Sequence, residues 1–174
     1  MFATLYVPNF YLQAALRHQP ELDGAAVALI DGKEAKAVIL QLNAAGEAAG
    51  VRCGMTPSQG LARHLPLVVK TRAREQEKLL TDLLLQFACS LSPFIEATAP
   101  GVCTVEFTSA SEISARVSGV IETLRSSEIL AQAGIAPNAD ASLLVAHLAR
   151  PVLQIGDAKT FLASLPIETL ALSA

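Results

Sequence analysis

The chain has 174 residues, a length that suits one compact unit or two small lobes and that buries roughly 70% of the surface exposed by an unfolded chain. Hydrophobic residues make up 52% of it and charged residues 17%, which excludes an intrinsically disordered protein. The formal net charge of -3 excludes the basic character of a domain that grips nucleic acid by itself, so we expect weak DNA binding at most.

Three features of the sequence bear on its compartment. Cys53, Cys89 and Cys103 are widely spaced and form no C-x-x-C pair, so we expect reduced, buried thiols and no zinc site. The apolar opening Met1–Leu16 has no basic n-region, which argues against a signal peptide. The apolar stretch Leu79–Leu91 is too short to span a membrane. We therefore expect a cytoplasmic protein that contacts no membrane.

Hydrophobic periodicity and turn signals divide the chain into strands and helices. In chain order we predict a strand at Phe2–Val7, a helix at Tyr11–His18, strands at Ala25–Ile30 and Ala37–Leu42, helices at Asn43–Ala49, Pro57–His64 and Arg72–Leu91, strands at Phe94–Thr98 and Val102–Phe107, a helix at Ser111–Leu124, a strand at Glu128–Ile135, a helix at Asn138–Arg150 and a strand at Val152–Ile155. The alternation of strand, helix and strand in the second half is typical of an α+β fold with a mainly antiparallel sheet.

Basic residues gather near the start of the helix predicted at Arg72–Leu91. Lys70, Arg72, Arg74 and Lys78 are interleaved with acids, which favours a solvated helix face; a patch that faces phosphate is the alternative.

The isolated polar side chains form no recognisable motif for nucleophilic or metal chemistry. We expect His18, His64 and His147 to be surface or capping groups. We expect Asp140 and Asp157 to be charges at helix N-termini.

Four blocks of residues follow one another in an order and at spacings that a known family shares. They are Pro20–Gly24 with Ala26-Val27-Ala28, Ala49–Met55, Gly134–Asn138 with Leu148–Pro151, and Phe161–Ile167. They resemble, in turn, P-E-L-x-G-x-P-V-A-V, F-G-V-R-S-G-M, G-I-A-x-N-K…L-A-K-P and F-L-x-x-L-P-I of the Y-family (translesion) DNA polymerases of the UmuC and DinB type. The chain resembles the N-terminal palm and fingers of that family over nearly its whole length.

The resemblance implies a fold and a domain division. The fold would be α+β, with a ferredoxin-like palm, a mainly antiparallel sheet with helices on one face, and a small α/β fingers subdomain. The palm would comprise residues 1–10 and 73–165, and the fingers residues 11–72. Residues 166–174 would begin a thumb that is missing or truncated.

The same resemblance points to lost catalytic residues. Phosphoryl transfer by two metal ions needs carboxylate ligands, which the family supplies in D-x-D-x-F at the end of the first strand and in S-I-D-E-A in a hairpin. Here Pro8 stands at the first position, within Tyr6–Phe10, and Gly101 and Val102 replace the Asp-Glu pair. The resemblance therefore implies no catalytic residue, no metal ligand and no Mg²⁺ cofactor.

The nearest carboxylates are Glu96 and Glu106, but each matches a family position that binds no metal, in V-E-P and A-Y-L-D-V respectively. A shift of one residue along a strand would also turn every side chain to the other face of the sheet. No carboxylate lies between Met1 and Pro20 to serve as the shared ligand.

The positions that contact the nucleotide triphosphate in the family are changed as well. Ala44 and Glu47 stand at the Tyr and Arg of its Y-x-x-R motif, and Ala139 and Leu143 at the lysines of N-K-x-x-A-K. An Arg-to-Glu exchange replaces attraction to phosphate with repulsion. We therefore expect no nucleotide-binding residue.

The pattern is most similar to the catalytically inactive, ImuB-like subunit of the bacterial mutasome. That similarity implies a noncatalytic adaptor in DNA repair and translesion synthesis. Its expected partners are an error-prone polymerase, an accessory mutasome protein and, through a missing C-terminal region, the sliding clamp. The alternatives are a nucleotidyltransferase or a damaged-DNA-binding protein whose activity needs domains beyond residue 174.

Overall fold

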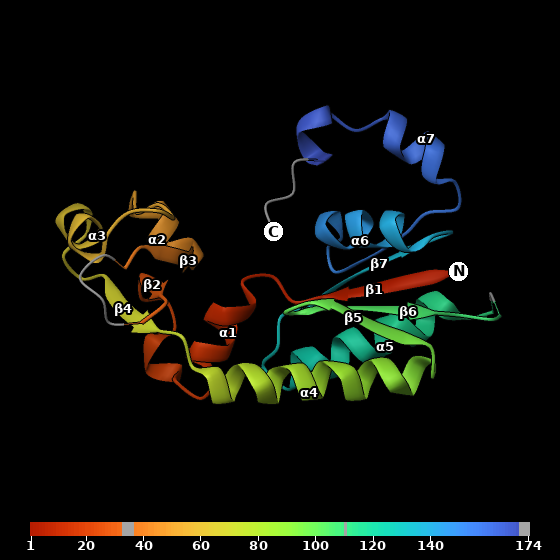
Figure 1. The fold of residues 1–174 in the computed structure, drawn as a ribbon, viewed down its shortest axis with the longest axis horizontal. Coiled ribbons are helices and arrows are strands. Elements are labelled where there is room, and N and C mark those ends of the chain that lie inside the picture. Colours follow the sequence, from red (N-terminus) through yellow and green to blue (C-terminus); the bar gives the residue numbers. More distant parts are fainter. Residues whose placement is uncertain (33–36, 110, 171–174) are drawn as a thin grey trace. The chain divides into compact units, whose positions relative to one another are not determined.

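The computed structural model describes residues 1–32, 37–109 and 111–170. The chain forms two compact units, unit 1 (Met1–Pro8 with Thr81–Ala174) and unit 2 (Asn9–Leu80) (Figure 1). The sequence predicted that the fingers comprise residues 11–72. Unit 2, which corresponds to them, begins two residues earlier, at Asn9, and ends eight residues later, at Leu80. The last four residues of the expected thumb start lie outside the described part of the chain.

Unit 1 is built on a five-stranded sheet. Its strands, in spatial order, are β5 (Ile95–Ala99), β6 (Val102–Glu106), β1 (Phe2–Tyr6), β7 (Gln132–Ala136) and β8 (Val152–Gln154). Three of the four pairings are antiparallel, and only β7 and β8 run parallel. The α+β class and the mainly antiparallel sheet are therefore confirmed.

Helices cover both faces of this sheet, where the expectation was one face. The helices α4 (Arg74–Leu91) and α5 (Ile113–Ser126) lie on one side, and α6 (Ala139–Leu148) lies on the other (Figure 1). Because side chains alternate along a strand, Thr4 of β1 faces α6, where it contacts Ser142, and its neighbours on β1 face the opposite layer. The parallel β7–α6–β8 connection is what carries α6 to the second face.

The core of unit 1 lies between the sheet and the helices α4 and α5. The odd-numbered residues of β1 and β6 are buried, and so is the apolar stripe of each helix. The buried residues of this layer are Ala3, Leu5, Cys103, Val105, Leu84, Ala88, Leu91, Val117, Ile121 and Leu124.

On the opposite face, α6 packs unusually close to β7. A Cβ atom added at Gly134 of β7 would lie 2.2 Å from the backbone N of Ala146 and 2.3 Å from the backbone O of Ser142. Only glycine leaves room for the α6 backbone at this position, and the sequence block Gly134–Asn138 therefore fixes how deeply α6 is seated.

Unit 2 is built on a small mixed sheet with β2 (Val27–Ile30) between β3 (Ile39–Leu42) and β4 (Val68–Thr71). The alternate side chains of β2 enter two separate apolar clusters. One contains α1 (Phe10–Leu16) and the other Leu42, Val51 and Leu67. All four residues of β2 are buried, as expected for a central strand that is covered on both faces.

Two short helices complete unit 2. The helix α2 (Ala44–Ala48) is capped by Asn43, whose side-chain Oδ1 accepts from the backbone N of Gly46 over 2.9 Å. The helix α3 (Pro57–Arg63) begins with a capping box formed by Thr56 and Gln59. Both starts agree with the sequence prediction.

Several short elements escaped the sequence prediction. They are β4 (Val68–Thr71), α7 (Ala158–Ala163) and the 3₁₀ helices Pro20–Leu22 and Ile167–Leu170. The strand predicted to start at Glu128 starts instead at Gln132, because Glu128 has a positive φ of 61° that closes a turn after α5.

The structure tests the predicted burial of the three cysteines and the predicted absence of a membrane-spanning segment. Cys103 is buried, but Cys53 and Cys89 are exposed, so the expectation of three buried thiols was wrong for two of them. Across residues 1–32, 37–109 and 111–170, none of the helices has the length and apolar character needed to cross a membrane.

Candidate functional site

The end of β1 and the β5–β6 hairpin meet at one corner of unit 1. The backbone N of Val7 donates to the carbonyl O of Gly101 over 2.8 Å, and Tyr6 pairs with Val102 across the two strands. Pro8 follows directly. The structure thus brings together Pro8, Gly101 and Val102, the three residues that the sequence places at the metal-ligand positions of the family.

None of these three residues carries a side-chain oxygen. Pro8 and Val102 are apolar, and Gly101 occupies the tight turn with a φ of +76°. The carbonyl O of Gly101 already accepts from Val7. Magnesium prefers carboxylate and water oxygens, so the residues at this corner do not match a two-magnesium site.

The carboxylates nearest in sequence do not lie at this corner. Glu106 pairs with Phe2 at the opposite end of β1, four residues and roughly 13 Å along the strand from Val102. Glu96 lies on β5, opposite Thr104. Among the described residues, no group of three or more His, Cys, Asp or Glu side chains is placed to hold a metal ion.

An aromatic pair lies beside the corner, on the face covered by α6. The rings of Tyr6 and His147 have centroids 4.1 Å apart and are tilted by 36°. Burial lowers the pKa of His147 and raises the pKa of Tyr6, so both rings are held in their neutral forms near pH 7. His147 was expected to be a surface or capping group; it lies in the last turn of α6, and its ring is half-buried against Tyr6.

Three buried hydroxyl groups also lie between the sheet and α6, on the same face of the sheet as Tyr6. Thr4 Oγ1 is 3.0 Å from Thr104 Oγ1 and 2.7 Å from Ser142 Oγ, and Ser142 donates to the carbonyl O of Ala139 over 2.7 Å. The cluster joins β1, β6 and α6, and each hydroxyl has a partner. Sequence reasoning missed it because no local spacing links residues 4, 104 and 142.

The two positions that replace the family's palm lysines lie at the start of α6. Asn138 caps the helix by accepting from the backbone N of Ala141 over 2.8 Å, which places Ala139 in the first turn and Leu143 one turn later. Both are half-buried and uncharged. Asp140 lies in the first turn of α6, and Asp157 caps α7, as predicted for helix N-terminal charges.

The two positions that replace the family's fingers residues lie on α2 in unit 2. Ala44 and Glu47 are both exposed. Glu47 lines an open hollow of about 460 Å³ together with Leu42, Arg52 and Cys53. The guanidinium of Arg52 donates to the carbonyl oxygens of Glu47 and Val51, each over 2.7 Å. A carboxylate and a guanidinium therefore line the same hollow.

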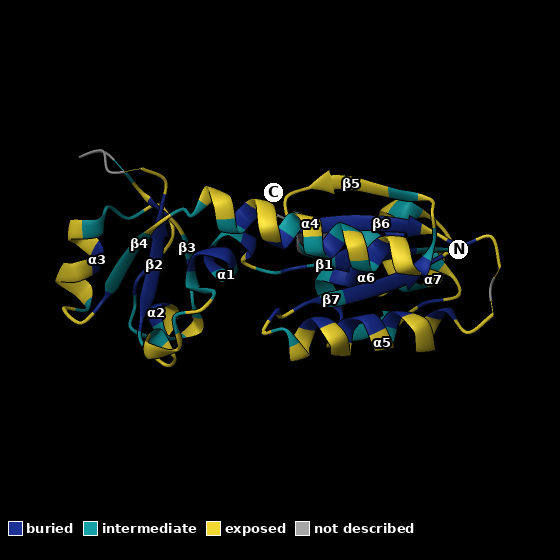
Figure 2. Ribbon diagram, turned by 90° about the horizontal axis from the view of Figure 1, so that it is seen from below, coloured by how far each residue is buried: buried dark blue, intermediate teal, exposed yellow. Residues whose placement is uncertain are grey.

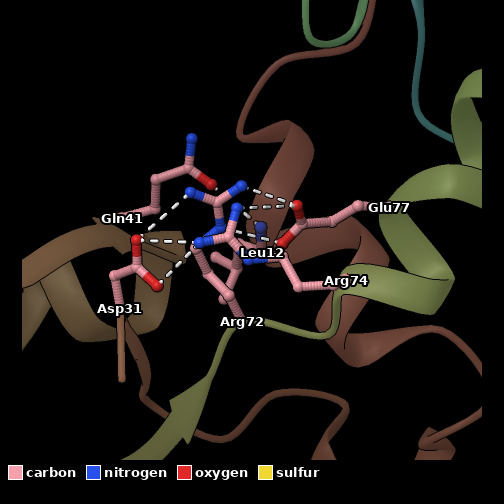
Figure 3. Close-up of polar contacts among 6 residues, drawn as sticks. All are labelled: Leu12, Asp31, Gln41, Arg72, Arg74 and Glu77. Carbon is pink, nitrogen blue, oxygen red and sulfur yellow. Dashed lines mark hydrogen bonds and ion pairs between the residues drawn. The ribbon is translucent and has the colours of Figure 1, made fainter.

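A buried ion-pair network holds the start of α4 in unit 2 (Figure 3). Arg72 binds Glu77 through two hydrogen bonds of 2.6 and 2.8 Å, and its guanidinium lies 3.7 Å from the ring centroid of Tyr11. Asp31 reaches Arg72 at 3.4 Å and Arg74 at 3.0 Å. The hydrogen bond to Glu77 is the main reason that the pKa of Arg72 is raised.

This network corrects the expected solvated face for Arg72 and Glu77, whereas Arg74, Glu75 and Lys78 are exposed as expected. The side chain of Arg72 is 13% exposed and pairs with Glu77, so its charge is committed to the interior of unit 2, whereas Arg74 is 62% exposed. Nearby, Gln41 Oε1 accepts from the backbone N of Leu12 over 2.8 Å and joins β3 to α1 (Figure 3). The alternative of a phosphate-facing patch loses Arg72 for the same reason.

Comparison with known proteins places the chain. A family model described as the impB/mucB/samB family matches residues 5–147. The structure of Dbh DNA polymerase in a post-insertion binary complex is similar with a TM-score of 0.85 and 15% identity, over 97% of this chain and 52% of that one. DinB from Sulfolobus solfataricus is similar with a TM-score of 0.84 and 14% identity, over 97% and 52%. The chain spans about half the length of these solved structures. No curated protein matches it.

Proposed function

This chain belongs to the impB/mucB/samB family, the Y-family DNA polymerases, and from that premise we propose that it is a noncatalytic member that acts as a protein-interaction adaptor in DNA repair and translesion synthesis. The family model and the fold show that the chain is related to Y-family DNA polymerases, and the noncatalytic adaptor role is our proposal.

The convergence of Pro8, Gly101 and Val102 at one corner of unit 1 is the observation that carries the proposal. Two-metal catalysis lowers the barrier by holding the attacking and leaving oxygens between ions that shared carboxylates position. These three residues offer no such oxygen, and Glu106 pairs at the far end of β1. The chain's own residues at this corner therefore supply apolar contacts in place of metal ligands.

The nucleotide positions support the same conclusion independently. A triphosphate needs cations or backbone N–H donors around its oxygens. Ala139 and Leu143 provide no charge on α6, and the exposed carboxylate of Glu47 repels phosphate on α2. A site that lost only its metal ligands would retain its phosphate-binding cations, so the two sets of changes favour a released polymerase function.

The adaptor part of the proposal follows from the family member that shares this pattern. The ImuB-like mutasome subunit lacks the acidic residues and links other proteins. We accordingly take an error-prone polymerase, an accessory mutasome protein and the sliding clamp as candidate partners, the clamp through a region beyond residue 174. We take DNA as a weak ligand at most, since the chain's formal net charge is -3.

Primer extension tests the noncatalytic claim. Purified protein is incubated with a primer–template duplex, all four dNTPs and either Mg²⁺ or Mn²⁺, beside a palm-and-fingers segment of an active Y-family polymerase cut at the matching residue. We expect no extension and no metal-dependent dNTP binding by calorimetry, even where the active segment binds dNTP. Extension that Glu106→Gln abolishes would overturn the proposal.

A further inference from the structure

The strand β5 forms an exposed edge of the unit 1 sheet. Among the residues that the structure describes, it pairs with β6 alone, at the end of the order β5-β6-β1-β7-β8. Glu96–Ala99 are exposed on both faces of the strand, and the side chain of Phe94, just before it, is 56% exposed (Figure 2). Exposed edge strands are templates for another strand, and proteins usually blunt them with lysine, proline or a bulge.

The hydrogen-bond phase identifies which backbone groups face outward. Glu106 donates through its backbone N to the carbonyl O of Phe94 over 2.9 Å, so the carbonyl of Phe94 and the backbone groups of Glu96 face β6, while the backbone N of Phe94 donates to Ser92 Oγ over 3.2 Å. Ile95 and Ala97 alternate with these two residues along the strand, so their backbone N–H and C=O groups point away from β6. A bulge between Ala97 and Ala99 ends the regular edge, which leaves a short stretch for pairing.

Side chains on one face of this edge combine an aromatic ring with two acids. Phe94 lies opposite Glu106, and Glu96 is the next residue on the same face, so the two carboxylates are diagonal neighbours roughly 7 Å apart. Both glutamates are exposed. One face of the edge thus carries an apolar side chain, Phe94, and two residues later a negatively charged one, Glu96.

The charge of the two units differs in sign. Unit 1 has nine Asp or Glu and four Lys or Arg, a net charge of -5, whereas unit 2 has seven acids and nine bases, a net charge of +2. The field around β5 therefore attracts cationic partners and repels a phosphate backbone. A second copy of the chain paired through the same edge would set Glu96 and Glu106 against like charges.

We propose that the β5 edge binds an extended, basic segment of a partner protein, which adds to the sheet as a further strand. The inference deepens the proposed adaptor function and rests on it. Backbone groups of Ile95 and Ala97 supply the main-chain hydrogen bonds, and Phe94 supplies a buried aromatic contact at the interface. Lysine or arginine at alternate positions of the segment pairs with Glu96 of β5, because alternate side chains of the added strand share one face, and the exposed Glu106 on β6, one strand further in, adds to the negative field.

The test uses the whole chain and a short acetylated peptide in which lysine alternates with valine, labelled for fluorescence anisotropy. Glu96→Lys reverses a charge at the edge. Glu122→Lys, on the exposed face of α5, changes the net charge of unit 1 equally and serves as the matched control. Ala97→Pro removes an outward N–H from the edge without removing a bond to β6. Thermal unfolding checks that each variant is folded.

We expect Glu96→Lys and Ala97→Pro to weaken peptide binding by about fivefold or more, and Glu122→Lys to change it by less than about twofold. N-methylation of alternate peptide residues should abolish binding at unchanged charge. If Ala97→Pro does not fold, the N-methylated peptide tests the same backbone bonds.

Equal effects of Glu96→Lys and Glu122→Lys, or undiminished binding of the N-methylated peptide, would reduce the interaction to general charge attraction and overturn the inference. Absence of binding would overturn it too, as would tighter binding of duplex DNA than of the peptide at this edge, or self-association lost in Ala97→Pro. Primer extension is a separate assay that tests the noncatalytic proposal. If the chain extends no primer and also fails to bind the peptide, this inference is wrong and the noncatalytic proposal is unaffected.

Discussion

The backbone N of Val7 donates to the carbonyl O of Gly101 over 2.8 Å, and this one bond joins the end of β1 to the turn of the β5–β6 hairpin. It brings together two segments more than ninety residues apart in the chain. The corner that they form holds Pro8, Gly101 and Val102, and none of these three side chains carries an oxygen atom. Both the fold and the proposed loss of chemistry can be examined by substitution.

The seating of α6 on β7 depends on Gly134. Gly134→Ala places a Cβ atom 2.2 Å from a backbone atom of α6, and we expect it to lower the free energy of unfolding by about 3 kcal/mol or more. Gly119→Ala on α5 is the control, because among the described residues nothing beyond its chain neighbours and the backbone of its own helix lies within 4 Å of its added Cβ. That control should stabilise the chain by about 1 kcal/mol. Urea unfolding measures both, and equal values would refute the close approach.

The buried pair of Arg72 and Glu77 should be costly to break. Glu77→Gln leaves the Arg72 guanidinium with only its longer pair to the half-exposed Asp31, and we expect a loss of about 3 kcal/mol in the free energy of unfolding. Arg74→Gln is the matched control, because Arg74 is 62% exposed and its pair with Asp31 is screened by water. A loss below about 1 kcal/mol for Glu77→Gln would show that Arg72 finds an equivalent partner.

The Tyr6–His147 contact should make stability depend on pH. Burial lowers the pKa of His147 in the folded chain, so the unfolded chain binds the proton more readily. Stability is therefore full above the unfolded pKa of about 6.5 and falls as pH drops through that value toward the folded pKa. We expect His147→Phe to flatten this part of the profile. An unchanged profile in His147→Phe would contradict the assignment.

The three thiols should separate by reactivity. Burial raises the pKa of Cys103 to about 11, whereas Cys53 and Cys89 are exposed. At pH 8 a thiol reagent should label two cysteines quickly and the third only on unfolding, because the thiolate is the reacting species. Mass spectrometry after partial labelling locates the sites, and rapid labelling of Cys103 would mean that β6 opens locally.

Helix starts and the central strands were predictable because their signals are local. Asn43 and Asn138 cap α2 and α6 at the residues where the sequence predicted these helices to begin, and β1 and β6 lie where apolar runs predicted strands. The family resemblance likewise pointed to the fold, which the family model and the solved structures confirm.

Long-range pairings were not predictable from the sequence. The strand β4 has four half-buried or exposed residues and exists because it pairs with β2, some forty residues earlier. The ion pair of Arg72 with Glu77 looked like a solvated charge run, since spacing alone does not show that Tyr11 covers one side. The placement of α6 on the second face follows from a parallel crossover, which the pattern of elements did not specify.

Manganese-induced broadening of backbone amide signals tests the central claim most directly. Mn²⁺ with dATP is titrated into the chain and, in parallel, into the matching segment of an active Y-family polymerase. We predict that the amides of Val7, Gly101 and Val102 stay as sharp as those of the distant α5, at a concentration that broadens the equivalent signals of the active segment. Selective broadening of these three amides would show a bound metal at the corner and contradict the loss of the polymerase site.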